Sequence, residues 1–433
     1  MGLDLRGASD PGRGIGDHAR EAPPAVARPG GVTTATLRTD DRLGVWCGWV
    51  LVGMAALTPL FAWLGPLGFQ LLAVVGLLCL PALKIGRREA PLAVVLTAAV
   101  VWAAFSMFWS IHKPGELEDS VALKLLLQLP LYWAAWAAAR RADPRLRRLA
   151  LQVFAWGLAA YGAILLVEAF TGAAIYRGLR DAIGDPIRAD LGRKNVAQGS
   201  FVLALLWPVA AAGGLRAGAP AWLALPMTAG TVLLAHNFLS DAPVLAVGLA
   251  VAVGGLVWVW PRSGPKALAL GAAGLVLVMP LLILAMHLLG LGRRLPDSWE
   301  QRVGYWTYAM QRIAEHPFRG WGLDSSRAFS PHIVLHPHNG ALQVWLELGL
   351  LGATAAALAY AFAFRRMARD QRSLVASATA GSAAVYLFFG VVSFGVWQEW
   401  WLALAALTAV IATLGDAEEA ATAKPIDAAG HYE

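Results

Sequence analysis

Three histidines, His332, His336 and His338, lie within seven residues of one another. Such a cluster could hold zinc, but no cysteine is near it, Pro337 stiffens the backbone and carboxylates are few in the surrounding loop. Histidine also suits general-base catalysis, because its ordinary pKa lies near neutrality. We therefore interpret one of these histidines as a base rather than a zinc ligand, and His338, which leads directly into the next predicted span, is the candidate. The alternative for His338 is a simple helix cap.

Arginines form the second group, and they gather in two loops, 171–195 and 290–338. Arginine makes bidentate contacts with phosphate and stays charged at any working pH. We therefore predict that these loops bind an anionic ligand. The alternative is contact with lipid headgroups, which we expect for Arg293 and Arg294. The arginines are Arg177, Arg180, Arg188 and Arg193 in the first loop, and Arg293, Arg294, Arg302, Arg312, Arg319 and Arg327 in the second.

One amphipathic helix is expected to position Arg302. The segment 297–317 begins with Ser298 and Gln301 in the spacing of a capping box, and Pro317 marks its end. Arg302 falls in the first turn, where free backbone amides add to an anion site; the alternative is an ordinary exposed arginine. The apolar face suits a helix on the membrane surface, and it comprises Trp299, Val303, Trp306, Met310 and Ile313.

A second helix should begin directly after His338. Leu342, Trp345, Gly349 and Gly352 follow at offsets that place them on the face of His338. Glycines on a membrane helix let a neighbouring helix approach closely. Upstream, Gly320 and Gly322 permit a tight backbone. The histidine is thus expected at the outer end of a closely packed helix.

The composition places these elements in a membrane. Of 433 residues, 58% are hydrophobic and 15% are charged, whereas roughly a quarter are charged in soluble domains. This excludes a soluble enzyme, a disordered scaffold and a secreted disulfide module. The net charge of +7 is explained by basic cytoplasmic loops, so no nucleic-acid partner is expected.

The chain is predicted to be an all-α, polytopic integral membrane protein with about twelve transmembrane helices. Residues 1–40 and 415–433 are expected to be polar cytoplasmic tails. Residues 41–289 hold spans one to nine, 290–338 form a large periplasmic catalytic loop, and 339–414 hold spans ten to twelve. The spans are 43–63, 66–83, 91–110, 121–139, 150–170, 196–214, 221–236, 243–260, 267–289, 339–364, 374–396 and 398–414; the seventh is short and interrupted by proline.

Lysine and arginine in short loops set the orientation. Basic clusters occur at 84–88, 140–148, 262–266 and 365–372. With twelve spans and a cytoplasmic N-terminus, all four clusters fall inside. The loops 111–120, 171–195 and 290–338 then fall outside, where their many arginines run against the usual bias.

These residues resemble the O-antigen ligase/O-antigen polymerase superfamily. The main match is His338-Asn339, nine residues, then Gly349-x-x-Gly352. Upstream, Pro317-x-x-Gly320-x-Gly322 and Arg302-x-x-x-Trp306 match the loop that precedes this histidine in the family. GRKNVAQGS, with Arg193 and Asn195, resembles the family's motif after an outer-loop arginine, and FSMFWSIHKP at the end of span three is also similar.

The resemblance implies a GT-C-like membrane glycosyltransferase in the bacterial inner membrane, with its active site facing the periplasm. It would transfer a glycan from undecaprenyl diphosphate to lipid A-core, with inversion and without metal or nucleotide cofactors. Arg302, with Arg188 or Arg193, would hold the diphosphate, while His338 accepts the proton. Asp241 stands where many relatives carry arginine, so any role of that arginine is lost or moved. The further substrate-binding positions are Asn195, Asn339, Arg319, Gly320, Gly322 and His336.

Several alternatives stay open. An O-antigen polymerase would use the same donor with a second lipid-linked glycan as acceptor, and a protein O-oligosaccharyltransferase is a third member of the class. A twelve-span lipid-glycan transporter is a different class, but neither a repeat nor a set of mid-span charges favours it. A rival base could come from Glu116, Glu118 or Asp119; the alternative there is solvated charge.

Overall fold

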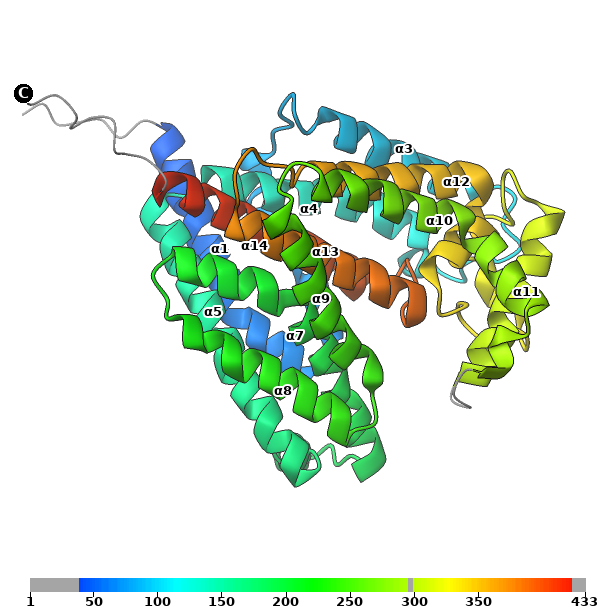
Figure 1. Cartoon of the computed structure of the whole chain (residues 1–433), viewed down its shortest axis with the longest axis horizontal. Coiled ribbons are helices and arrows are strands. Elements are labelled where there is room, and N and C mark those ends of the chain that lie inside the picture. Colours follow the sequence, from blue (N-terminus) through cyan, green and yellow to red (C-terminus); the bar gives the residue numbers. More distant parts are fainter. Residues whose placement is uncertain (1–38, 295–298, 423–433) are drawn as a thin grey trace, which may run out of the picture. The chain divides into compact units, whose positions relative to one another are not determined.

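The computed structural model describes residues 39–294 and 299–422, and within these ranges it contains helices and no strand (Figure 1). Nine described helices are long and apolar enough to cross a membrane. The prediction of an all-α, polytopic membrane protein is confirmed. These helices are α1 (Thr39–Leu64), α4 (Val121–Arg141), α5 (Pro144–Thr171), α7 (Ala189–Arg216), α9 (Asp241–Val259), α10 (Gly264–Leu288), α12 (Gly340–Arg365), α13 (Leu374–Val392) and α14 (Glu399–Thr422).

The other three predicted spans are shorter helices. The second is divided into 3-10 turns at Pro66–Leu71 and Leu80–Ala82 on either side of α2 (Leu72–Leu78). Proline lacks an amide hydrogen and interrupts an α-helix, which accounts for both turns. The third span is α3 (Ala90–Ser106), and the seventh is α8 (Ala224–Asn237).

Two further helices belong to the loops that carry the candidate residues. α6 (Ala174–Ala182) lies between α5 and α7. α11 (Glu300–Glu315) lies within the range predicted as an amphipathic helix. Its apolar face packs on α10 and α12, so the chain itself covers residues that we expected to meet the membrane surface. Of the predicted capping box, Ser298 lies outside the described residues, and the Gln301 side chain donates to the Tyr305 hydroxyl at 2.7 Å instead.

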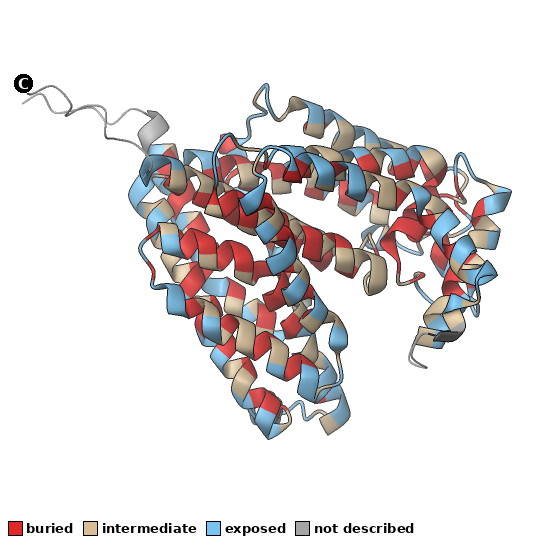
Figure 2. Ribbon diagram, in the orientation of Figure 1, coloured by how far each residue is buried: buried red, intermediate tan, exposed pale blue. Residues whose placement is uncertain are grey.

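The described helices form two large hydrophobic cores and a smaller one between α3, α4 and α12 (Figure 2). The first is built mainly by α1, α4, α5, α7, α8 and α14, and the second by α10, α11 and α12. α9 and α13 contribute to both: Ala250 of α9 packs in the first core and Val257 in the second. The candidate site lies where the second core meets the end of α13.

The predicted basic loops meet at one end of the helices, which we call the basic end. The loops between α2 and α3, α4 and α5, α9 and α10, and α12 and α13 are joined there by hydrogen bonds. This agrees with the prediction that all four face the same side. The joining contacts are Arg140 to the Lys84 carbonyl at 2.9 Å, Arg366 to the Arg88 carbonyl at 3.1 Å, and the Arg369 amide to the Pro261 carbonyl at 3.0 Å.

The C-terminal tail predicted from residue 415 begins later than expected. α14 continues to Thr422, and its acidic last turns bind the basic end. Glu418 is fully buried and pairs with Arg147 at 3.2 Å and Arg148 at 2.6 Å. These partners come from distant parts of the sequence, so local composition did not predict the extra helical turns.

Candidate active site

The central feature of the site is a break in α12. Gly349 has φ 64° and ψ −160°, a non-helical conformation inside the helix. Residues 317–322, which we call the 317–322 segment, lie against this break. The break therefore joins the large loop to a membrane-spanning helix.

Hydrogen bonds with the 317–322 segment replace those that the helix loses. The amides of Trp321 and Gly322 donate to the carbonyls of Leu346 and Glu347 at 2.9 and 2.8 Å. In return, the Leu350 amide donates to the Pro317 carbonyl at 2.8 Å. Trp102 of α3 donates its indole N–H to the Leu348 carbonyl at 3.0 Å. Because buried backbone groups need partners, the segment and the helix stabilise each other.

The glycines of the motif are explained by this close approach. A Cβ on Gly349 would lie 2.4 Å from the Phe318 carbonyl, and one on Gly320 would lie 2.4 Å from the Glu347 carbonyl. A Cβ on Gly322 would lie 2.4 Å from Ser110 Cα. All three glycines have positive φ, which disfavours other residues. Packing thus accounts for Gly320 and Gly322, and their substrate-binding role stays a prediction.

His338 lies immediately before α12, at the end of α13. Its Nδ1 is 2.9 Å from the Ser393 carbonyl oxygen. Asn339, rather than the histidine, caps α12, because its Oδ1 accepts from the Leu342 amide at 3.0 Å. Asn339 is buried, so its side chain is not exposed in the way that the predicted substrate contact would require.

The hydrogen bonds of the two neighbouring histidines give them different proton positions. A carbonyl oxygen can only accept, so Nδ1 of His338 carries the proton and Nε2 keeps a free lone pair. His336 is the opposite case, since its Nδ1 accepts the His338 backbone N–H at 3.2 Å. The proton of neutral His336 therefore lies on Nε2. Of the two rings, whose centroids are 4.4 Å apart, only His338 offers a base.

Burial and charge keep both rings neutral. Burial lowers the pKa of His338 below 6.5, and the nearby Arg302 charge lowers it further, while the Ser393 carbonyl acts in the opposite direction. Burial also lowers the pKa of His336 to about 3, with the nearby Arg327 charge as a smaller cause. His338 is thus available as an unprotonated base at neutral pH.

α11 supplies the neighbours of His338. Tyr305 lies parallel to the imidazole, with ring centroids 6.2 Å apart, and Trp306 donates its indole N–H to the Pro337 carbonyl at 2.9 Å. Arg302, one turn earlier, stacks over Trp299 at 5.1 Å. Burial lowers the pKa of Arg302, so a bound anion would offset the cost of burying its charge.

The second arginine group lies at the start of α7 and makes no direct contact with the histidines among the described residues. Arg188 is bound to Asp190 through two contacts of 3.1 and 3.0 Å. Arg193 is exposed and has no hydrogen bond or ion pair to any residue in 39–294 or 299–422. Asn195 donates to the Tyr176 hydroxyl at 3.3 Å, which fixes α6. Of the two competing arginines, Arg193 is free for a ligand.

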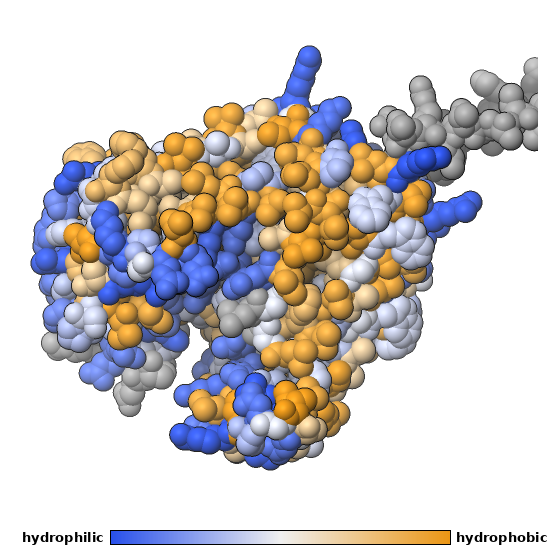
Figure 3. Space-filling model, turned by 180° about the vertical axis from the view of Figure 1, so that it is seen from behind, coloured by the Kyte–Doolittle hydropathy of each residue, from blue (hydrophilic) through white to orange (hydrophobic). Residues whose placement is uncertain are grey.

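The two groups border the same hollow. α11 lies at one side of Figure 1, and the turn around residues 170–190 forms the lower tip. Seen from behind, the surface between these parts is hollowed, and both rims carry hydrophilic residues (Figure 3). A long ligand lying in the hollow would have on its two sides the elements that carry the two arginine groups.

The remaining candidates lie elsewhere. Arg319 is exposed and stacks over Trp109 at 5.8 Å, on the α3 side of the 317–322 segment. His332 stacks on Tyr308 with centroids 4.5 Å apart. Of the rival acidic residues, Asp119 lines a cavity that His336 also lines. Arg319 and His332 thus contact other aromatic residues than His338 does, and Asp119 shares with His336 a cavity that His338 does not line.

Sequence reasoning missed Glu347. This fully buried carboxylate of α12 accepts four hydrogen bonds and links three segments. A charged residue inside an apolar span was the available signal, because such residues are rare and functional. The donors are the Asp324 amide at 2.6 Å, the Ser326 hydroxyl at 2.5 Å, Gln343 Nε2 at 3.0 Å and Trp397 Nε1 at 2.6 Å.

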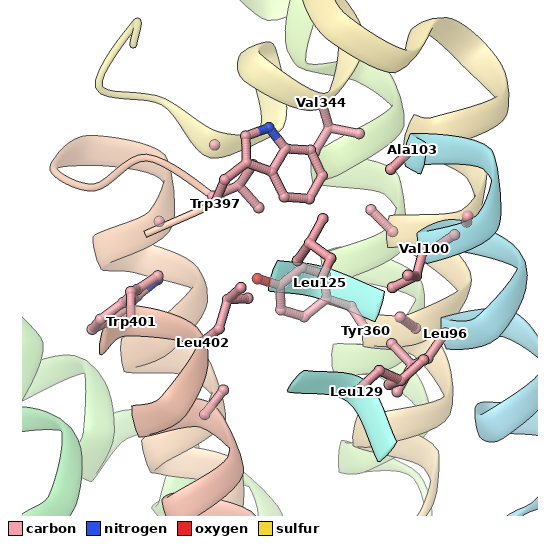
Figure 4. Close-up of a pocket in the computed structure, with 18 of the residues that line it drawn as sticks. Leu96, Val100, Ala103, Leu125, Leu129, Val344, Tyr360, Trp397, Trp401 and Leu402 are labelled. Atoms are coloured by element: carbon pink, nitrogen blue, oxygen red, sulfur yellow. The ribbon is translucent and has the colours of Figure 1, made fainter. Parts of the chain in front are cut away.

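Two cavities adjoin this network. The polar one has a volume of about 510 Å³ and is lined by His112, Lys124, Arg327 and His336, among others. The apolar one, of about 420 Å³, lies between α3, α4, α12 and α14, whose side chains converge on it (Figure 4). Leu125, Gln128 and Trp397 line both. The apolar lining suits a hydrocarbon chain, and the polar lining suits a hydrophilic group.

Comparison with known proteins identifies the region. Residues 222–357 match a family model described as O-Antigen ligase; this range contains Arg302, the 317–322 segment, His338 and Gly349, but not Arg188 or Arg193. Two similar proteins, each named "Putative polysaccharide ligase", come from Rickettsia conorii and Rickettsia bellii. They are 26% and 27% identical over 192 and 194 residues, which cover 39% and 40% of this chain. The matches span 46% and 47% of those relatives, or about half their length.

Proposed function

Because the chain belongs to the O-antigen ligase family, we propose that it transfers a polysaccharide from undecaprenyl diphosphate to lipid A-core. The reaction takes place at the periplasmic face of the bacterial inner membrane and requires neither metal nor nucleotide. The basic end, with its four arginine- and lysine-rich loops, faces the cytoplasm. The loop that holds His338 then faces the periplasm.

The observation that carries this proposal is the free lone pair of His338 Nε2 beside Arg302. Nε2 takes the proton of an acceptor hydroxyl as its oxygen attacks the anomeric carbon of the donor. The new C–O bond forms as the bond from the anomeric carbon to the diphosphate oxygen breaks. Undecaprenyl diphosphate leaves with the electron pair, and the configuration at the carbon is inverted.

The arginines stabilise the leaving group. We assign Arg302 of α11 and Arg193 of α7 to the diphosphate, because Arg302 is half-buried and Arg193 has no hydrogen bond or ion pair to any described residue. Negative charge grows on the diphosphate oxygens as the bond breaks, so fixed cations lower the barrier more than they stabilise the bound donor.

The test is a transfer assay with purified protein, undecaprenyl-diphosphate-linked glycan and lipid A-core, run in EDTA. A glycan-bearing lipid A-core product that disappears with His338→Ala supports the proposal. Growth of the glycan on its own lipid carrier would instead identify a polymerase. A metal requirement, or full activity of the alanine variant, would contradict the mechanism.

A further inference from the structure

The polar cavity that His336 lines does not have the excess of positive charge expected of an anion-binding site. Its lining residues include three carboxylates, Asp119, Asp324 and Glu399, against two cations, Lys124 and Arg327. Both cations are already paired: Lys124 lies 2.8 Å from Glu399, and Arg327 lies 2.9 Å from Asp324. A diphosphate would find no free cation among these lining residues, whereas Arg193 offers one elsewhere.

The cavity instead offers amide groups that could bind hydroxyls. Gln128 and Gln398 line it, and so do Gln343 and Trp397, whose polar side-chain atoms are already bonded to Glu347 and to the Val396 amide. The amide oxygens of Gln128 and Gln398 accept no hydrogen bond from any described residue. Unpaired buried acceptors are costly, and the terminal amide torsion is soft enough to turn them toward a ligand. A ligand with many O–H donors would satisfy them.

We propose that this cavity binds the acceptor's neutral sugar residues and presents a hydroxyl to His338. The inference rests on the proposed function. His336 lines the cavity, and its ring centroid is 4.4 Å from that of His338. His338 is not itself a lining residue, so a hydroxyl held in the cavity reaches its Nε2 past the His336 ring; the substrate that supplies this hydroxyl is the acceptor. The cavity volume of about 510 Å³ lies within the range of roughly 300–1,000 Å³ that is typical of ligand sites.

The proposal also separates the two substrates. The donor diphosphate lies in the hollow between α11 and the start of α7, and the acceptor sugar approaches from the cavity behind His336. Neutral His336, with its proton on Nε2, can donate a hydrogen bond to a sugar oxygen without competing for the proton that His338 removes.

The experiment measures the KM for lipid A-core and the KM for the lipid-linked donor in separate titrations. Gln398→Ala is expected to raise the acceptor KM about tenfold, the cost of one lost hydrogen bond, with the donor KM unchanged. Gln128→Leu, which keeps the side-chain volume, should act in the same direction and serves where Gln398→Ala fails to fold. Gln371→Ala is the matched control, since Gln371 is exposed at the basic end. A raised donor KM, or no change in either, overturns the proposal.

Binding of lipid A-core to the His338→Ala protein is measured in parallel. Binding that weakens about tenfold on adding Gln398→Ala supports the cavity even where the wild type forms no product, which would refute the proposed function alone. Binding that is absent, or unaffected by the glutamine substitutions, refutes the cavity whether or not transfer occurs.

Discussion

In the proposed mechanism His338 acts through one ring nitrogen, and its hydrogen-bond partners decide which. The Ser393 carbonyl holds the proton on Nδ1, so the basic lone pair lies on Nε2. Replacing His338 with alanine should lower the transfer rate by about 10²–10⁴-fold, the usual contribution of a positioned base. His332→Ala is the control, because that exposed ring contacts Tyr308 instead. Equal losses in both variants would contradict the assignment.

The same ring sets the pH dependence. Because the pKa of His338 is lowered below 6.5, the base is unprotonated at and above that pH. The kcat/KM for transfer should therefore be level above pH about 6.5 and should fall only as the pH drops through the lowered pKa. Measured rates from pH 5 to 9 check this, and a profile that falls toward high pH would point to a group that must be protonated.

Arg188 and Arg193 matched one family position in the sequence, and their pairing separates them. Arg188 is engaged with Asp190, and Arg193 is not engaged with any described residue. Arg193→Ala should raise the donor KM roughly 10–100-fold, the value of a charge-assisted bond to phosphate. Arg188→Ala should have a smaller effect. Donor titrations of the two variants compare them directly, and the reverse order would transfer the role to Arg188.

At the scale of elements, the break in α12 depends on Gly349. Its backbone lies in a region open essentially to glycine alone, and an added Cβ would meet the Phe318 carbonyl. Gly349→Ala should destabilise the fold by at least about 1–3 kcal/mol, seen as a lower midpoint of thermal unfolding. Gly271→Ala in α10, where nothing lies within 4 Å, is the matched control and should be neutral or stabilising.

Glu347, two residues before that break, joins α12 to residues 324–326 and to Trp397. A carboxylate only accepts hydrogen bonds, so all four donors are satisfied. Glu347→Gln would turn an amide N–H₂ toward groups that already donate, with an expected loss of roughly 1–3 kcal/mol. Thermal unfolding of the purified variant measures it. A midpoint equal to that of the wild type would show that the network contributes little to stability.

Elements with a local signal were predictable, and those set by distant partners were not. The hydrophobic spacing of 300–315 indicated α11, and the His-Asn pair marked the start of α12. The pairing of residues 317–322 with 346–351 left no local trace, because each side alone reads as a loop or a continuous helix. The sequence therefore indicated a tight backbone at Gly320 and Gly322 but not what lies against it, and their substrate-binding role stays a prediction.

For the molecule as a whole, the charge pattern predicts which loops share a side of the membrane. In the proposed orientation, Asp181 of α6 faces the periplasm and Gln371 faces the cytoplasm. The two native cysteines are buried, so a single added cysteine gives a clean signal. On intact cells, a membrane-impermeant maleimide should label Asp181→Cys but not Gln371→Cys, and permeabilised cells should label both. The opposite pattern would invert the topology.

The sequence predicted the fold class of the whole molecule correctly but not the bounds of every helix. Apolar runs located the long helices, and the basic loops do meet at one end. Three of the twelve predicted spans are short helices, and α14 extends to Thr422. Proline geometry accounts for the 3-10 turns on either side of α2. Pairing with Arg147 and Arg148 accounts for the added turns of α14. Hydropathy alone carries neither kind of information.

The hydrogen bonds between the 317–322 segment and the break in α12 limit which segments can be exchanged between related proteins. The large loop shares backbone hydrogen bonds with the interior of a membrane helix, so its covalent ends at 290 and 338 do not mark a separable module. A loop transferred from a relative would lack the matching backbone groups of α12 that pair with it, unless the exchanged segment extends past Gly352. Sequence changes in this loop are thus expected to be inherited together with changes in α12, as one block from the end of α10 through the first half of α12.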